Sequence, residues 1–326
     1  MARLAGVSPG TVSHVLNHPH RVTPHTRARV QAAIDELGFA PDRRARALAG
    51  GASTLIGFIV VDLTNSYFVD MARGAQEAAQ DAGMTVLLAD SAMSADRELT
   101  YLQLLDEERF AGILLVPRPT IADDVWRSRS WTRDIVLLNA QPVGDRCGVA
   151  PDDELGGYKA TRHLIERGRR DLVFAGGPFT LHPVAARHRG AQRAVAETNG
   201  GVRLSTVATE GLRPRHGREV GDRLAQTRPA DRPDGVVAAA DLLGLGVVQA
   251  LAGRPGLSVP DDLSVVGYDN NQASWESPVP LTTVAQPGHE IGRTAVRLLL
   301  EEMRERASHQ HQQVLLEPSL VVRSSS

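Results

Sequence analysis

The sequence has a single cysteine, Cys147, in 326 residues. One chain therefore cannot hold an internal disulfide, and such cysteine usage is typical of a reducing cytosol. No apolar run approaches the ~18 residues that a membrane-spanning helix requires. Residues 1–30 carry Arg, His and Pro where a secretory signal would have an apolar segment. We therefore predict a cytoplasmic chain without membrane contact, in which Cys147 is an ordinary buried thiol.

Sequence signatures of common enzyme classes are also missing. The chain has no G-x-x-x-x-G-K-[ST] loop, and Gly244-Leu245-Gly246 does not continue as a dinucleotide-binding G-x-G-x-x-G. No Ser/His/Asp set can be placed by spacing. His309 and His311 suggest a metal only weakly, because the Ser and Gln residues around them favour a polar loop. We predict no enzymatic activity, no cofactor and no metal site.

The charge is unevenly distributed along the chain. Residues 1–50 carry a net charge of +4 and the remainder carries −6. A small basic segment on an acidic body is typical of a nucleic-acid-binding module, although ordinary solvated surface charge gives the same pattern.

Residues 1–40 have helical features throughout. Ser8-Pro9 and Thr23-Pro24 each place a capping hydroxyl before a proline, which is the pattern of a helix start. An apolar face at helical spacing follows the second start, with Val30, Ala33, Ile34 and Leu37. We predict an all-α domain over 1–40 and a hinge helix with its linker over 41–52.

From Ser53 onward, short apolar runs alternate with helical patterns, which predicts parallel sheets covered by helices. The expected strands are Leu55–Val61, Thr85–Ala89, Gly112–Val116, Ile135–Leu138, Leu172–Ala175, Leu204–Ala208, Val236–Ala239 and Leu263–Gly267, with a final extended segment at 314–322. The alternation restarts after Asp152, so we predict two lobes. The N-lobe takes about 53–150 and 284–312, and the C-lobe about 151–283 and 313–326. A ligand would bind in the cleft between them.

The stretch Ala5–Asn17 has the pattern of a DNA-reading helix. Gly6 lies where two helices must turn sharply, and the small core comes from Val7, Val12 and either Val15 or Leu16. The residues left on the outer surface are Pro9, Gly10, Thr11, Ser13, His14 and Asn17. A short helix that presents polar residues from its first two turns fits the major groove of DNA. Any small helical bundle is the alternative.

This stretch resembles the helix-turn-helix of the LacI/GalR family of bacterial repressors, in particular members of the lac and purine repressor type. The resemblance continues through Val22-Thr23-Pro24 and the hinge Arg43–Leu48, and it covers nearly the whole chain. It implies a helix-turn-helix head followed by a periplasmic-binding-protein-like sensor of two doubly wound lobes. The residues that it implies at DNA are Ser8, Pro9, Gly10, Thr11, Ser13, His14, Asn17, Arg27, Arg43, Arg46 and Leu48.

Within that set the resemblance implies different roles. His14 would do most of the direct base reading, because Pro9 and Gly10 offer no side-chain hydrogen bonds. The residues expected at phosphates, which position without specifying, are Thr11, Ser13, Asn17 and Arg27. Leu48 would enter the minor groove and bend the duplex, with Arg43 and Arg46 beside it on the backbone. Ordinary packing at a domain junction is the alternative for Leu48.

The resemblance also implies an effector site in the sensor. Its residues are Tyr67, Phe68, Asp152, Arg187, Asp269, Trp275 and Gln286. Charged groups such as Arg187 and Asp269 would hold a polar ligand by charge-assisted hydrogen bonds. A network of ion pairs between the lobes is compatible with this role. Tyr67 and Phe68 are equally interpretable as loop-anchoring core residues, and Trp275 as plain core.

The implied function is transcriptional repression by a homodimer, bound to palindromic double-stranded operator DNA on the nucleoid. The implied effector is a sugar or nucleoside-like molecule. A periplasmic sugar-binding protein would share the two lobes, but residues 1–50 contradict that alternative. Members of the family usually start their first helix several residues earlier than Met1. We therefore expect that Met1 is a GTG codon chosen as the start, so that the native chain begins upstream.

Overall fold

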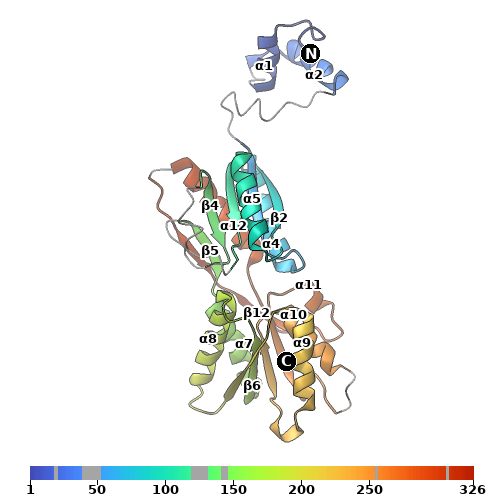
Figure 1. Cartoon of the computed structure of the whole chain (residues 1–326), viewed down its shortest axis with the longest axis vertical. Helices are drawn as coiled ribbons and strands as arrows, with labels where there is room; N and C mark the ends of the chain where they lie inside the picture. Colours follow the sequence, from blue (N-terminus) through green and yellow to red (C-terminus); the bar gives the residue numbers. More distant parts are fainter. Residues whose placement is uncertain are drawn as a thin grey trace. The chain divides into compact units, whose positions relative to one another are not determined.

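The computed structural model describes residues 1–17, 21–38, 53–118, 131–140, 146–252, 254, 256–305 and 308–326. These residues form two compact units, Met1–Ser53 and Thr54–Ser326 (Figure 1). The expected hinge at 41–52, with Arg43, Arg46 and Leu48, lies outside the described residues.

The first unit is helical, with α1 over Pro9–Asn17 and α2 over Pro24–Glu36. Its small core consists of Ala5, Val12, Val15, Val30 and Ala33. Leu37, which the periodicity places on the apolar face, is instead 52% exposed. The reason is that α2 ends at Glu36, so Leu37 is its C-cap and leaves the helical face.

Both expected helix starts form as hydroxyl caps. The backbone N–H of Thr11 donates to Ser8 Oγ at 3.1 Å, and that of Thr26 donates to Thr23 Oγ1 at 3.5 Å. Gly6 has φ +60°, a conformation that favours glycine, and it makes the expected sharp turn before α1. The local rules for helix starts therefore hold throughout this unit.

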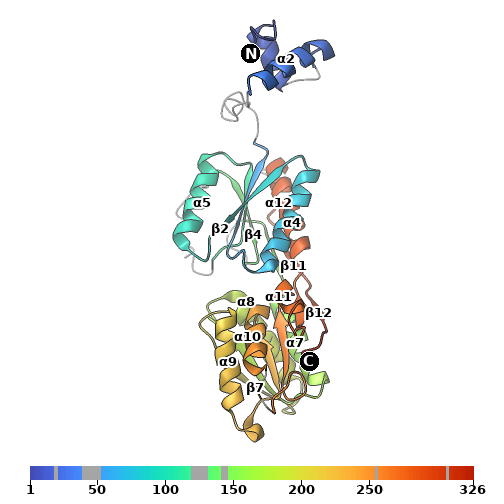
Figure 2. The same cartoon turned by 90° about the vertical axis from the view of Figure 1, so that its right-hand side faces the viewer.

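The second unit begins with a parallel sheet whose strand order is β11-β5-β4-β3-β1-β2. Its strands are β1 (Leu55–Val60), β2 (Thr85–Asp90), β3 (Gly112–Leu115), β4 (Asp134–Leu138), β5 (Gly148–Pro151) and β11 (Gln313–Leu316). One face is covered by α5 (Ala95–Glu107), and the other by α4 (Ser66–Asp81) and α12 (Gly288–Glu305) (Figure 2). This first lobe has an apolar core on each face of the sheet.

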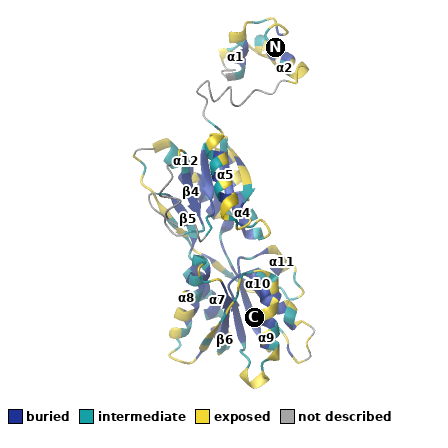
Figure 3. Cartoon of the chain, viewed as in Figure 1, coloured by how far each residue is buried: buried dark blue, intermediate teal, exposed yellow. Residues whose placement is uncertain are grey.

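The second lobe repeats this architecture with the strand order β12-β10-β9-β8-β6-β7. Its strands are β6 (Asp171–Gly176), β7 (Arg203–Ala208), β8 (Gly235–Ala238), β9 (Ser264–Tyr268), β10 (Thr282–Ala285) and β12 (Ser319–Val321). The helices are α7 (Asp153–Glu166), α8 (His182–Ala196), α9 (Pro214–Gln226), α10 (Asp241–Leu251) and the short α11 (Gln272–Trp275), with a 3-10 turn η2 at Pro229–Asp231. The central strands of both sheets are buried between their helices (Figure 3), whereas the edge strands β2 and β7 are partly exposed.

The chain passes between the lobes after β5, after β10 and between β11 and β12. The boundary expected at 313 is therefore wrong, because β11 pairs in parallel with β5 in the first sheet. Only β12 joins the second sheet, antiparallel to β10. Glu317 and Pro318 separate two strands that the sequence pattern presents as one extended segment, and each strand completes a different sheet edge.

Several helix pairs cross at reciprocal glycines. A Cβ on Gly157 of α7 would overlap the carbonyl oxygen of Arg187 in α8, and a Cβ on Gly190 of α8 would overlap that of Glu154 in α7. The equivalent pairs are Gly74 with Gly292 between α4 and α12, and Gly217 with Gly246 between α9 and α10. The helix backbones therefore touch, and α7 brings Asp153 next to Arg187.

We expect Gly157→Ala to lower the free energy of unfolding by roughly 3 kcal/mol or more, because the new methyl group meets backbone that cannot rotate away. Gly244→Ala is the matched control, since its Cβ would meet the flexible Leu281 side chain at 3.1 Å. Urea unfolding of both variants measures the difference. Equal losses would show that the close approach of α7 and α8 is not a tight constraint.

Candidate functional site

The exposed side of α1 is the candidate DNA-reading surface. Ser8, Pro9, Gly10, Ser13 and His14 are all exposed, whereas Thr11 is half-buried. The hydroxyls of Ser8 and Thr11 lie 2.9 Å apart. Arg27 is exposed on α2. The side chain of Asn17 is outside the described part of the chain.

Arg29 supports this surface, although the sequence interpretation did not single it out. Its guanidinium donates to the carbonyl oxygens of Ala5 at 2.6 Å and Gly6 at 3.0 Å. These bonds hold the turn before α1 against α2. In the sequence, Arg29 is an arginine beside Val30 on a short amphipathic helix. Most solvated arginines fit the same description, so this pattern does not single out Arg29.

A cavity of about 660 Å³ lies between the two lobes. Its lining includes five of the expected effector residues, namely Tyr67, Phe68, Arg187, Asp269 and Gln286. The first two come from the start of α4 in the first lobe, and Arg187 comes from α8 in the second lobe. Asp269 directly follows β9, at the carboxyl edge of the second sheet. The site therefore lies where ligands bind in doubly wound folds.

Arg187 is the buried cation of the cavity, with 4% of its surface exposed. Its Nε donates to Asp153 Oδ1 at 2.8 Å, and its Nη1 donates to the carbonyl oxygen of Ala239 at 2.6 Å. The guanidinium also stacks 3.7 Å from the ring centre of Tyr268 and lies 3.7 Å from Asp269 Oδ1. Burial opposes its charge, but these neighbouring groups raise the pKa of Arg187 above its usual value.

Asp269 is held by amides from both lobes. Its Oδ2 accepts from Asn65 Nδ2 at 3.0 Å, and its Oδ1 accepts from Gln286 Nε2 at 2.6 Å. Burial raises the pKa of Asp269 to about 6, against the opposing effect of Arg187. Its φ of +110° is a conformation that non-glycine residues rarely adopt, so the surrounding contacts hold the residue in place.

Asn65 is the first-lobe residue that reaches across to these groups. Its Oδ1 caps α4 by accepting from the Tyr67 N–H at 3.0 Å, and it also accepts from Asn271 Nδ2 at 2.9 Å. A second interlobe contact joins Arg213 to Asp62 at 3.5 Å, and both residues line the cavity. The sequence interpretation did not identify the role of Asn65 between the lobes.

Tyr67, Asn139 and Gln286 are lining residues with buried polar atoms that have no hydrogen-bond partner within the described chain. These atoms are Tyr67 Oη, Asn139 Oδ1 and Gln286 Oε1. A buried polar atom without a partner costs about 1–3 kcal/mol. The Tyr67 ring packs against Phe68 with ring centres 5.1 Å apart. The cavity thus offers an aromatic wall and polar atoms that a ligand can satisfy.

Two expected effector residues lie outside the cavity lining. Asp152 instead caps α7, because the turn after β5 directs its Oδ1 to the Leu155 N–H at 2.8 Å. Its neighbour Asp153 makes the ion pair with Arg187. Trp275 is 47% exposed, so the plain-core interpretation is wrong, and its Nε1 donates to the carbonyl oxygen of Asn270 at 3.0 Å.

Asp241 is a fully buried carboxyl behind the cavity. It accepts from Thr283 Oγ1 at 2.6 Å, from the Asn271 N–H at 2.6 Å and from Ser274 Oγ at 2.9 Å. Burial, together with the nearby charge of Asp269, raises the pKa of Asp241 to about 8. Asp241 therefore fixes Asn271, which in turn contacts Asn65.

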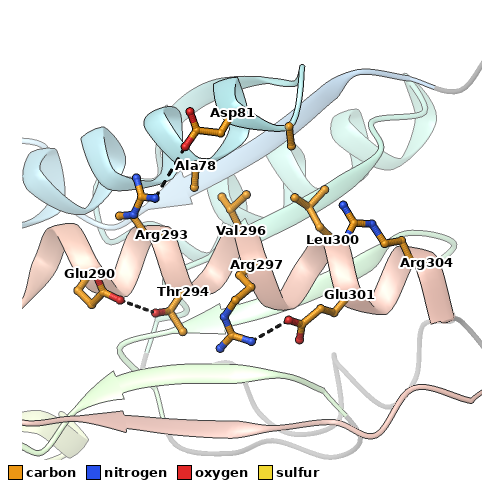
Figure 4. Close-up of a pocket in the computed structure, with 11 residues that line it drawn as sticks. Ala78, Asp81, Glu290, Arg293, Thr294, Val296, Arg297, Leu300, Glu301 and Arg304 are labelled. Carbon is orange, nitrogen blue, oxygen red and sulfur yellow. Dashed lines mark hydrogen bonds and ion pairs between the residues drawn. The ribbon is translucent and has the colours of Figure 1, made fainter.

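A second hollow runs along α4 and α12 in the first lobe, with a volume of about 490 Å³ (Figure 4). Most of its charged side chains form ion pairs with one another. Arg293 contacts Asp81 at 3.8 Å, and Arg297 contacts Glu301 at 2.8 Å on the same helix. This hollow has the paired charges of a solvated surface, in contrast to the interlobe cavity.

The segment with His309 and His311 is an exposed, irregular loop, as the sequence predicts, but the His309 side chain turns inward. The His309 side chain is only 2% exposed, and its Nε2 lies 3.1 Å from the Sγ of Cys147. With Glu302 these residues form a group that has metal-ligand chemistry, outside the lining of the interlobe cavity.

Within the described ranges, no helix has the length and apolar character needed to cross a membrane.

Comparison with known proteins identifies both units. Residues 1–42 match the family model of bacterial regulatory proteins, lacI family, and residues 161–326 match that of a periplasmic-binding-protein-like domain. The chain is 32% identical over its whole length to the HTH-type transcriptional repressor PurR of Vibrio campbellii, covering 97% of that protein. It is 30% identical to the PurR of Aliivibrio fischeri strain MJ11, covering 96%.

Solved structures agree with these relatives. The Lac repressor bound to ONPG in the repressed state superimposes with a TM-score of 0.85 at 25% identity, covering 100% of this chain and 98% of that one. A Lac repressor dimer bound to operator and the anti-inducer ONPF gives 0.85 at 25%, covering 99% and 97%. A complex of the transcriptional regulator CelR with cellobiose gives 0.73 at 27%, covering 100% and 98%.

The raised pKa of Asp241 predicts how stability changes with pH. In the unfolded chain this carboxyl loses its proton near pH ~4, but in the folded chain it keeps it to about 8. The folded state binds the extra proton between these values. The contribution of Asp241 to stability is therefore complete below pH ~4 and is lost as the pH rises through about 8.

We expect the Asp241→Asn variant to lose less stability than the wild type when the pH rises from about 5 to about 9, because the amide cannot ionise. Urea unfolding at a series of pH values measures the slope. Asp222→Asn is the control, since Asp222 is half-exposed in an ion pair with Arg254 and should leave the wild-type slope unchanged. If the free energy of unfolding changes with pH equally in wild type and Asp241→Asn, the raised pKa of Asp241 is contradicted.

Proposed function

The chain belongs to the LacI family of bacterial regulatory proteins, and we propose that it represses transcription as a homodimer on a palindromic operator, controlled by a small polar metabolite. Its relatives are transcriptional repressors, which is a non-enzymatic role. The observation that carries the proposal is the combination of two features in one chain. One is an exposed helix-turn-helix surface on α1, and the other is a cavity with buried, unpartnered polar atoms. The place of action is the nucleoid in the cytoplasm.

The exposed side of α1 supports the DNA-binding residues that the sequence predicts. His14 is the base-reading residue, because Pro9 and Gly10 beside it have no side-chain donors or acceptors. Thr11, Ser13, Asn17 and Arg27 bind phosphates, and Ser8 belongs to the same DNA-binding set. Arg43 and Arg46 bind the backbone at the hinge, and Leu48 enters the minor groove. The exposure of Ser13, His14 and Arg27 supports these roles.

The effector is a sugar or nucleoside-like molecule. A ring can pack on Tyr67 and Phe68, while hydroxyl or carbonyl groups satisfy Arg187, Asp269 and Gln286. Similar solved structures carry cellobiose and ribose, which supports a sugar. A ligand at these groups also meets the Asn65–Asp269 contact between the lobes, so its binding couples to the relative position of the lobes.

Dimerisation is supported by the edge of the first sheet. β2 is an edge strand, and its Leu87 and Leu88 are 48% and 38% exposed. Natural edge strands usually avoid such exposed apolar side chains unless another chain covers them. The Lac repressor dimer on operator DNA provides the precedent for a second copy. Two heads then face the two halves of a palindrome.

The DNA-binding proposal is tested with the full-length protein and palindromic promoter fragments, using fluorescence anisotropy. We expect His14→Ala to lose discrimination between operator variants with a modest loss of affinity. Arg43→Ala should weaken binding to all sequences and reduce the salt dependence, because it removes a phosphate contact. If the two variants behave alike, the division between base and phosphate contacts is wrong. If the wild type ignores palindromic DNA at low salt, with and without metabolites, the function is wrong.

The effector proposal is tested by a thermal-shift screen over sugars, polyols and nucleosides. A ligand at about 100 times its Kd adds about 2.7 kcal/mol of stability. Tyr67→Phe removes only an unpartnered hydroxyl, so the free protein should keep or gain stability while the ligand shift falls. Tyr158→Phe is the control, because that hydroxyl donates to Glu197 at 2.6 Å outside the cavity lining. If the ligand-induced thermal shift is unchanged in Tyr67→Phe, the ligand does not contact the Tyr67 hydroxyl.

A further inference from the structure

Four side chains with metal-ligand chemistry meet in the first lobe, and we name them the Cys147 cluster: Cys147, Glu302, His309 and His311. Cys147 directly precedes β5, and Glu302 lies in the last turn of α12. The two histidines lie in the segment just before β11. Because β5 and β11 are parallel neighbours, residues that precede them meet at the same edge of the sheet. This is the amino edge, opposite the edge that faces the interlobe cavity.

The ligand atoms of the cluster all lie within 4.8 Å of one another. Cys147 Sγ is 3.1 Å from His309 Nε2 and 3.9 Å from His311 Nδ1, and His311 Nδ1 is 3.8 Å from Glu302 Oε1. A tetrahedral Zn²⁺ with bonds of ~2.0–2.3 Å separates its ligand atoms by roughly 3.3–3.7 Å. The observed separations therefore need only small side-chain adjustments around such an ion.

The surroundings also have the features of a metal site. Glu302 Oε2 is buried and has no hydrogen-bond partner within the described residues, so a carboxylate oxygen remains for an ion. His309 Nδ1 lies 3.3 Å from Glu305 Oε2, which is the carboxylate contact that commonly orients a metal-bound histidine. The Gln312 N–H donates to Cys147 Sγ at 3.4 Å and would stabilise a thiolate.

The Cys147–His309–Glu305 sequence of contacts also resembles a thiol nucleophile with its base and orienting carboxylate. Burial argues against that alternative. Cys147 has no exposed surface, and neither described hollow includes it in its lining. A substrate would have to displace the histidines to reach the sulfur, whereas an ion binds among the four groups. Thiolate and imidazole ligands favour zinc and exclude calcium or magnesium.

We propose that the Cys147 cluster binds one Zn²⁺ per chain through Cys147 Sγ, His309 Nε2, His311 Nδ1 and a Glu302 carboxylate oxygen. The thiol releases its proton to solvent when it binds. The ion joins the end of α12 to the starts of β5 and β11. At its other end, α12 begins two residues after Gln286, so the same helix extends from the interlobe cavity to the zinc site.

The test uses the untagged full-length protein, freed of metal with a chelator and titrated with Co²⁺. Because Cys147 is the only cysteine in the sequence, a thiolate-to-cobalt charge-transfer band must come from this residue. We expect that band at one equivalent, together with visible bands of tetrahedral intensity, and loss of both when one equivalent of Zn²⁺ is added. Zn²⁺ should also raise the Tm of the metal-free protein. Octahedral cobalt spectra without the charge-transfer band would overturn the proposal.

Variants separate this site from adventitious binding. Cys147→Ser should abolish the charge-transfer band, and the His309→Gln, His311→Gln double variant should weaken Zn²⁺ binding more than 100-fold in competition with a chromophoric chelator. Glu305→Gln should weaken it by about 10–100-fold, because it removes only the orienting contact. The control is His188→Gln, a histidine that contacts Thr206 in the second lobe and should bind Zn²⁺ as the wild type does. Equal Zn²⁺ affinity in the wild type and the double variant would refute the site, whether or not Cys147→Ser folds.

Discussion

The side-chain amide of Asn65 is the contact on which the arrangement of the sensor depends. It caps the helix that carries Tyr67, accepts from Asn271 and donates to Asp269, so a single residue of the first lobe engages the second lobe at two points. Behind these partners, Asp241 holds Asn271 and Arg187 holds Asp153. A change at the cavity therefore passes directly to the contact between lobes, which is the coupling that an effector-controlled regulator requires.

The buried charges of Arg187, Asp153 and Asp269 compensate one another only in their present positions. Arg187 lies between two carboxylates that would cost about 3–5 kcal/mol if left without their cation. Its position depends on backbone contact between α7 and α8, where Gly157 and Gly190 leave no room for side chains. Electrostatics and packing are thus linked, because the ion pair with Asp153 needs the close approach that the glycines permit.

The first lobe connects two sites of different character through α12. Near its start lies Gln286, whose Oε1 is one of the buried unpartnered atoms of the cavity. Near its end lies the Cys147 cluster, which joins three segments distant in sequence. In between, Gly292 packs against the backbone of α4, the helix that carries Tyr67 and Phe68. Contacts at the cavity end and at the Cys147 end of α12 therefore both act on α12, and α12 packs against α4, which carries two residues of the effector site.

Local patterns were sufficient to predict the caps at Ser8 and Thr23 and the turn at Gly6, whereas the placement of Arg187 and Asp269 at the cavity was implied by the resemblance to the family. Tertiary structure decided that Asp153 rather than Asp152 pairs with Arg187, and that β11 joins the first sheet. It also brought His309 and His311 to Cys147, which the sequence presents as a polar loop and an isolated thiol. Capping and periodicity act between residues a few positions apart and are therefore visible in the chain, whereas these contacts span up to 165 positions and depend on how sheets and helices pack.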